Sequence, residues 1–103
     1  MTPIVFQVLL ALADHDLHGL GIMEEVLERT GGTMRLWPAM LYRNIQKLSD
    51  EGLIVEVPSE TTMVGRARYF RLTAAGRRAC AAEARRLQEF VTAARHKRHL
   101  TRP

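Results

Sequence analysis

Cysteine is almost absent from this sequence, since Cys80 is the only one among 103 residues. A lone cysteine cannot close a disulfide within the chain or build a cysteine-based zinc site, which argues against a small secreted protein held together by disulfides. Long apolar runs are absent too, because residues 3–13 fall well short of the about 20 residues that span a bilayer. That run also lacks the basic residues and the small-residue cleavage site of a secretory signal. The sequence therefore predicts a cytoplasmic, soluble protein with no membrane contact.

Signatures of catalysis are missing as well. The chain has no glycine-rich phosphate loop, no nucleophile elbow and no set of residues with metal-ligand spacing. Its carboxylates are scattered over expected solvent-facing positions and do not converge on an apolar pocket. His96 and His99 stand close together, but the cationic Arg95, Lys97 and Arg98 beside them repel a metal ion. We therefore expect no enzyme activity, no cofactor and no metal site.

The composition is that of an ordinary globular protein, but the charge is distributed unevenly along the chain. Apolar residues make up 47% and charged residues 25% of a chain long enough for one domain with a modest core. Residues 1–65 hold four basic and nine acidic side chains, a net charge of −5, whereas residues 66–103 hold eleven basic and two acidic ones, a net of +9. A basic half suits a polyanionic partner. It suits a solvated, highly charged helix equally well, so charge alone leaves both interpretations open.

Apolar periodicity and the usual start and stop signals divide the chain into helices and strands. Pro3 and Pro38 each suit a first helical turn, and the glycines at 31–32 and 52 suit helix ends. The β-branched and aromatic runs on either side of a polar loop over 58–66 indicate a hairpin. We expect four helices, over residues 3–14, 19–30, 38–51 and 74–97, and two strands, over 53–57 and 67–72.

Two of these helices carry apolar surface that a small chain has difficulty covering alone. The helix over 3–14 is apolar on nearly all sides, so we expect a second copy of the chain to help cover it. The helix over 74–97 would be about 36 Å long and has an apolar stripe at helical spacing, which indicates a dimerisation element. We therefore predict a homodimer. Its predicted interface residues are Ile4, Val5, Val8, Leu87, Phe90, Val91 and Ala94.

The order of the elements, three helices followed by a hairpin, is that of a winged helix-turn-helix. In this fold the third helix enters the major groove of DNA and the hairpin, or wing, contacts the duplex alongside. We expect a mainly α fold with a small β-hairpin. It would divide into a DNA-binding domain over 1–73, a long C-terminal dimerisation helix over 74–97 and a frayed basic tail over 98–103.

Five segments of the sequence together resemble the PadR family of transcriptional regulators. They are LHGLGIM (17–23), ERTGG (28–32), LYRNIQKL (41–48), EGLI (51–54) and RYFRLTAAG (68–76). Each segment is weakly specific alone, but their colinear order across the chain is specific. The resemblance implies a homodimeric repressor with a winged-helix head and a single C-terminal dimerisation helix. It also implies a small aromatic or drug-like effector bound near the dimer interface.

Three positions depart from the family pattern. Trp37 stands where a small hydroxyl residue commonly precedes the proline, Ala39-Met40 replaces the usual Gly-Thr, and Leu20 replaces an aromatic residue after His-Gly. Met40 has no hydroxyl for a phosphate, so backbone N–H groups at the helix start would be the anion donors. For Trp37 the favoured interpretation is a half-buried core anchor. Stacking on DNA and lining a small-molecule pocket are the alternatives.

The candidate DNA-reading residues lie on the helix over 38–51. A projection at about 100° per residue places Arg43, Gln46 and Lys47 opposite the apolar stripe, where Arg or Lys can pair with guanine and Gln with adenine. Around them, hydroxyl, guanidinium and backbone groups would contact phosphates, and wing arginines would meet the minor groove. The full predicted set is Arg35, Pro38, Ala39, Met40, Tyr42, Arg43, Gln46, Lys47, Arg66 and Arg68.

These observations predict a sequence-specific regulator of transcription, a homodimeric repressor on a pseudo-palindromic double-stranded operator that a small effector releases. The alternative is a winged-helix module that binds another protein and no longer reads DNA. The acidic first half and the altered entrance to the third helix favour that alternative.

Overall fold

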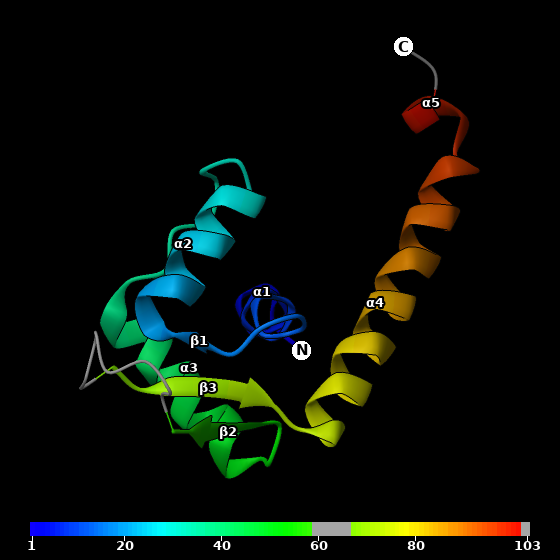
Figure 1. Cartoon of the computed structure of the whole chain (residues 1–103). Helices are drawn as coiled ribbons and strands as arrows, with labels where there is room; N and C mark the ends of the chain where they lie inside the picture. Colours follow the sequence, from blue (N-terminus) through cyan, green and yellow to red (C-terminus); the bar gives the residue numbers. More distant parts are fainter. Residues whose placement is uncertain (59–66, 102–103) are drawn as a thin grey trace.

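The computed structural model describes residues 1–58 and 67–101, which form helices packed on a small antiparallel sheet (Figure 1). The predicted mainly α fold with a small hairpin is confirmed. In chain order the elements are α1 (Pro3–Ala11), β1 (Leu17–His18), α2 (Gly19–Arg29), α3 (Pro38–Asp50), β2 (Ile54–Val57), β3 (Tyr69–Leu72), α4 (Ala74–Arg95) and α5 (Arg98–Thr101).

The helices begin where the sequence supplies caps. The side chains of Thr2, His18 and Thr73 accept hydrogen bonds from the third residue along, which satisfies backbone N–H groups that have no partner within the helix. Helix α3 starts differently, because Trp37 gives no side-chain cap and Pro38 alone presets the first turn. Of the helices α1 to α4, three thus begin with a local side-chain hydrogen bond, and the exception is the helix expected to meet DNA.

The sheet has three strands in the order β1-β3-β2, one more than the sequence predicted. Strand β1 is only two residues long, and pairs Leu17 with Phe70 and His18 with Tyr69. No alternation of apolar and polar residues can be detected over two residues, which is why periodicity missed it. The hairpin of β2 and β3 was predicted and is confirmed, with Ile54 paired to Leu72 and Val57 to Tyr69.

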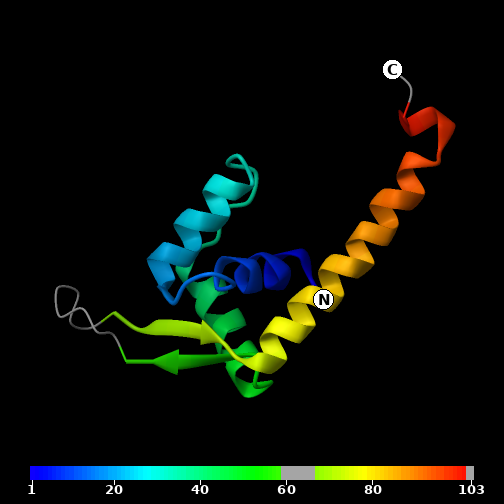
Figure 2. The same cartoon turned by 45° about the vertical axis from the view of Figure 1, so that its right-hand side comes forward.

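Helix α1 runs through the middle of the fold, between α2 and α4 (Figures 1 and 2). Its all-round apolar surface is therefore covered largely by its own chain. Val5 and Val8 are 8% and 0% exposed, so the prediction that they contact a second copy is corrected: they belong to the core. Ile4 keeps part of its surface. The buried side chains of the core also include Leu9, Leu12, Ile22, Val26, Leu41, Ile45, Leu48, Ile54, Phe70 and Leu72.

The first half of α4 is fixed to the head, by which we mean residues 1–73. Gly76 lies so close to the backbone carbonyl of Leu53 that a Cβ there would collide with it. The Thr73 hydroxyl donates to the Gly52 carbonyl at 2.6 Å and accepts from the Gly76 N–H at 3.0 Å. One side chain thus joins the end of the α3–β2 turn to the start of α4.

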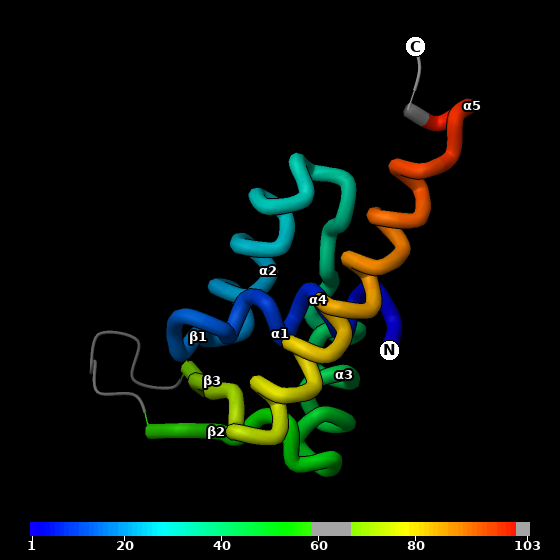
Figure 3. The backbone as a smooth tube through the Cα atoms, turned by 90° about the vertical axis from the view of Figure 1, so that its right-hand side faces the viewer, coloured from blue at the N-terminus to red at the C-terminus, as the bar shows by residue number. Residues whose placement is uncertain are grey.

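The second half of α4 extends away from the head (Figures 2 and 3), in a molecule measuring 54 × 28 × 22 Å. Beyond Glu83 no residue of α4 is fully buried. Residues 98–101 form the short helix α5, so the expected frayed tail is wrong for this part. Within the described residues, none of the helices is both long and apolar enough to span a membrane.

Candidate nucleic-acid interface

One side of α3 is buried and the other is open. Leu41, Ile45 and Leu48 are buried in the core, as the spacing predicted. On the opposite side Arg43 and Lys47 are exposed, and within the described residues neither forms an ion pair. Two cationic side chains are therefore presented on one exposed helix face.

The other side chains of this face already have neighbours. The Gln46 amide donates to the Asp50 carboxylate one turn later, at 2.9 Å. Tyr42 is on the border of the exposed face, with its ring against Gly19 at the start of α2, where any Cβ would meet the phenol. To pair with a base, Gln46 has to exchange its contact with Asp50. Tyr42, by contrast, is held in position by α2.

The start of α3 differs most from expectation. Trp37 is 62% exposed, so the favoured interpretation of a half-buried anchor is wrong. Its neighbour Leu36 occupies the core position instead, and the Arg35 guanidinium lies 5.6 Å from the centroid of the indole ring. Since Trp37 supplies no cap, the first backbone N–H groups of α3, at Ala39 and Met40, are available to an anion. The Met40 side chain packs partly against the core.

Of the two predicted wing arginines, Arg68 is among the described residues, and it is paired. Arg68 donates to Glu56 across the hairpin at 3.0 and 2.8 Å and lies 5.4 Å from the centroid of the Phe70 ring. The hydrogen bonds with Glu56 raise the pKa of the Arg68 guanidinium, so it is fully charged. The predicted wing-tip residue Arg66 lies outside the described residues.

A second exposed region runs along the far half of α4. Phe90 is 57% exposed and Val91 is exposed as well, while Leu87 and Ala94 keep part of their surface. The Arg86 guanidinium lies 5.2 Å from the centroid of the Phe90 ring. These side chains form a stripe that no other element among the described residues covers. We call Leu87, Phe90, Val91 and Ala94 the α4 stripe.

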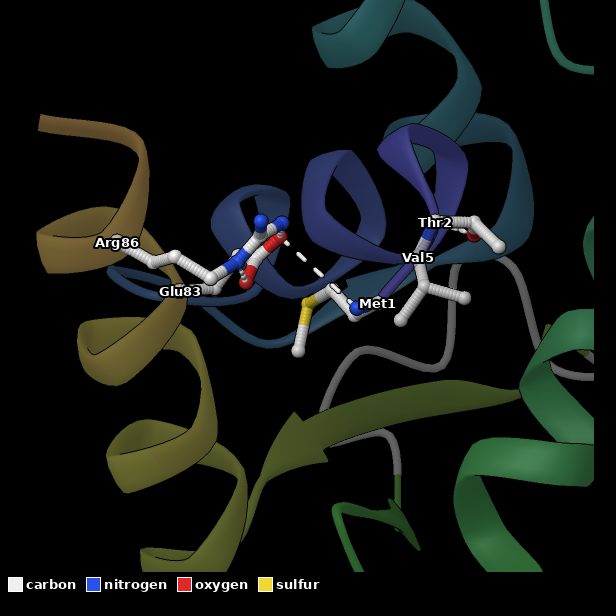
Figure 4. A network of polar contacts seen from close by, with 5 residues as sticks. All are labelled: Met1, Thr2, Val5, Glu83 and Arg86. Atoms are coloured by element: carbon white, nitrogen blue, oxygen red, sulfur yellow. Dashed lines mark hydrogen bonds and ion pairs between the residues drawn. The ribbon is translucent and has the colours of Figure 1, made fainter. Parts of the chain in front are cut away.

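Between the head and the α4 stripe, a charged group holds α4 against α1 (Figure 4). Arg86 donates two hydrogen bonds to Glu83, at 2.7 and 2.6 Å, and the ammonium of Met1 lies 4.0 Å from the same carboxylate. The Arg86 guanidinium holds the pKa of Glu83 below its ordinary range. Periodicity had given no sign of this contact, since Glu83 interrupts the apolar positions of the helix.

The arrangement offers cations and helix N-terminal donors, but no group of titratable residues suited to catalysis. Across residues 1–58 and 67–101, no three His, Cys, Asp or Glu side chains come together as metal ligands. Burial raises the pKa of the Cys80 thiol, which keeps it protonated and unreactive. The chemistry that remains is recognition of an anionic surface.

The comparisons with known proteins agree with this geometry. The sequence matches the transcriptional regulator PadR-like family over residues 8–82. It has no significant match among curated proteins. Among the solved structures that are similar in fold to the chain, three have 20–22% sequence identity to it.

The first is a PadR family transcription regulator from Clostridium difficile, with 20% identity and a TM-score of 0.79 over 89% of this chain and 94% of that one. The second is a transcriptional regulator from Clostridium thermocellum, with 22% identity and a TM-score of 0.72 over 91% and 93%. The third is Bacillus subtilis PadR in complex with operator DNA, with 20% identity and a TM-score of 0.70 over 81% of this chain and 48% of that one.

Proposed function

Because the chain belongs to the PadR-like family of transcriptional regulators, we propose that it is a homodimeric, sequence-specific DNA-binding repressor released by a small effector. Members of this family are transcription regulators and not enzymes. The observation that carries the proposal is the open face of α3, which presents Arg43 and Lys47 opposite a buried stripe. The Bacillus subtilis relative in complex with operator DNA supports it.

In the proposed complex α3 enters the major groove. Arg43 and Lys47 pair with guanine and Gln46 with adenine, because these side chains match the donors and acceptors of those bases. The remaining contacts are to phosphates and sugars and fix the register of the protein on the duplex. The proposed backbone contacts are Arg35, Pro38, Ala39, Met40, Tyr42, Arg66 and Arg68.

The α4 stripe supplies the proposed dimer surface. A Phe and a Val exposed side by side on a helix that leaves the head are stabilised by burial against a second copy. Two heads joined in this way read a pseudo-palindrome with half-sites about 34–36 Å apart. The proposed domains are accordingly the head over 1–73, the dimerisation helix over 74–97 and the basic segment over 98–103.

An apolar pocket supports the proposal that a small effector binds this protein. It has a volume of about 310 Å³ and lies between α1, β3 and α4, where it is lined by Leu10, Ala13, Leu72, Arg77, Cys80, Ala81 and Ala84. A small aromatic molecule in this pocket would alter how α4 packs on the head. Since α4 sets the separation of the two heads in the proposed dimer, such a ligand changes the affinity for the operator, and DNA changes the affinity for the ligand.

Titration of labelled DNA at several salt concentrations tests the DNA-binding function. The logarithm of the binding constant should fall linearly with the logarithm of salt, since phosphate contacts release counterions. Selection from random fragments should yield one sequence preferred over bulk DNA by about a thousandfold or more. A protein with no affinity for any duplex at low salt would instead be a winged-helix module for a protein partner. The acidic α2 surface at Glu24 and Glu28 favours that second function.

A further inference from the structure

Two of the positions at which this chain departs from the PadR pattern come together in space. Leu20, on the first turn of α2, is 57% exposed, and Trp37, just before α3, is 62% exposed. Both line an open pocket of about 210 Å³, to which Met23 and Leu27 of α2 also contribute. We call Leu20, Met23 and Trp37 the entrance patch. No element of the described chain covers it.

The position of the entrance patch relative to α3 is fixed. Leu36 is held in the core and Pro38 is the first residue of α3. Trp37 lies between them and is exposed at the N-terminal end of α3. In helix-turn-helix proteins the N-terminal end of the recognition helix is the part that enters the groove, while the preceding helix crosses the backbone. The start of α2 and the start of α3 therefore border the same strand of a bound duplex.

Of the two charged side chains that line the pocket, the cationic Arg35 suits that strand and the anionic Glu24 does not. The Arg35 guanidinium lies 5.6 Å from the centroid of the indole ring, which brings a cation to the edge of an apolar surface. A DNA strand presents the complementary arrangement, because each anionic phosphate lies next to the largely apolar face of a deoxyribose. The indole N–H is a donor, and none of the hydrogen bonds among the described residues involves it.

We propose that the entrance patch is a second DNA contact, in which Trp37 and Leu20 pack on a deoxyribose bordering the groove and the indole N–H donates to the adjacent phosphate. The proposal rests on the proposed DNA-binding function and goes beyond it. In the proposed contact, the packing of apolar side chains on a deoxyribose replaces the hydroxyl–phosphate contact of the family pattern. Because the contact is to the backbone, it adds affinity for every sequence and no base preference.

Tryptophan fluorescence tests the contact directly, since Trp37 is the only tryptophan in the chain. A labelled mixed-sequence duplex is added at low salt, its anisotropy reports binding, and acrylamide quenching reports access to the indole. Binding should shift the emission to shorter wavelength and protect Trp37 from acrylamide. Protein that binds DNA while Trp37 stays fully quenchable overturns the patch contact and leaves the proposed function standing.

Two other outcomes are equally decisive. Protection that grows with protein concentration in the absence of DNA would assign the patch to contact between two copies of the chain, and would overturn the proposal. An unchanged anisotropy at low salt would show that no DNA is bound, in which case both the function and the patch contact fail. Each result is recognised from the same titration.

Variants distinguish an apolar contact from a charged one. Trp37→Ala should weaken binding to all duplexes about tenfold, with no change in the slope against salt because no cation is lost. Trp37→Phe should recover part of the loss, since it restores the apolar ring but not the N–H. Arg35→Ala should reduce the slope by about one.

Leu100→Ala is the control, because Leu100 is a large apolar residue that is 71% exposed, against 62% for Trp37, but lies on α5. It should leave both affinity and slope unchanged. Circular dichroism confirms that each variant is folded, as expected for exposed positions. A Trp37→Ala protein with unaltered affinity, or with a loss confined to one base position, would contradict a backbone contact.

Discussion

The head and the far half of α4 use the same kinds of side chain in opposite ways. In the head, Phe70 of β3 is completely buried, whereas Phe90 on α4 is 57% exposed. The head and the first half of α4 together close one core, since α1 packs against both α2 and α4 and Cys80 of α4 is a core residue. The α4 stripe has no such cover. We therefore expect the head and the first half of α4 to form the folding unit, and we propose that the far half of α4 serves assembly.

The largest expected effect separates the two phenylalanines. Phe70→Ala should lower the free energy of unfolding by about 3–5 kcal/mol, because it leaves a cavity in a packed core. Phe90→Ala, measured at a protein concentration low enough for monomers, should change it by less than about 0.5 kcal/mol. Chemical denaturation followed by circular dichroism gives both values. Equal losses would mean that the far half of α4 belongs to the folding unit.

The next effect concerns assembly. Leu87→Asp combined with Phe90→Asp places two carboxylates in the α4 stripe, so light scattering should show monomers while circular dichroism shows an unchanged head. Gln88→Asp with Thr92→Asp adds the same charge to the neighbouring face of the helix and should leave the dimer intact. If the first double variant remains a dimer, the stripe is not the interface.

A smaller effect is expected on DNA reading. Arg43→Ala should cost about 1–3 kcal/mol and relax the preference at one base position, as expected for a side chain that pairs with a base. Arg85→Ala removes the same charge from the exposed surface of α4 and should leave the sequence preference unchanged. Competition binding with single-base operator variants measures both. A uniform loss on all sequences would reassign Arg43 to a phosphate.

The smallest effect tests the ion pair of Glu83 with Arg86 within α4, beside the N-terminus of the chain. Arg86 lowers the pKa of Glu83 in the folded chain, so the ionised pair stabilises the fold at neutral pH. This stabilisation is fully present above the ordinary pKa of a Glu carboxyl and is lost as the pH falls through the lowered pKa of Glu83. Glu83→Gln should remove this part of the acid dependence of thermal unfolding. Glu89→Gln, exposed on the same helix, should retain it, and identical pH profiles for the wild-type and Glu83→Gln proteins would count against the pairing.

Much of the head could be predicted because its signals are local. The stripe of Leu41, Ile45 and Leu48 and the prolines at helix starts specify elements through periodicity and backbone geometry alone. Strand β1 could not be predicted, since two residues pair only when β3 is already beside them. The cover of α1 could not be predicted either, because it depends on how α2 and α4 are placed around Val5 and Val8.

The candidate site was predictable in part. Exposure of Arg43, Gln46 and Lys47 followed from the helix projection and is confirmed, while their contact with DNA stays a prediction. For Trp37 the composition-based expectation of burial was wrong, since adjacent Leu36 took the one inward position available before Pro38. The hydrogen bond of Gln46 to Asp50 depends on side-chain rotamers, and that of Arg68 to Glu56 depends on how the two strands pair. Residue spacing in the sequence determines neither.

Thr73 is the single residue between β3 and α4. Its hydroxyl is hydrogen-bonded to both Gly52 and Gly76, so the junction has little freedom to rotate. The angular phase of α4 is therefore locked to that of the sheet. One extra residue inserted just after this junction would turn everything beyond it by about 100° and advance it by about 1.5 Å. In a symmetric assembly such an insertion would point the two heads in new directions, whereas seven added residues would nearly restore the phase and lengthen the arm.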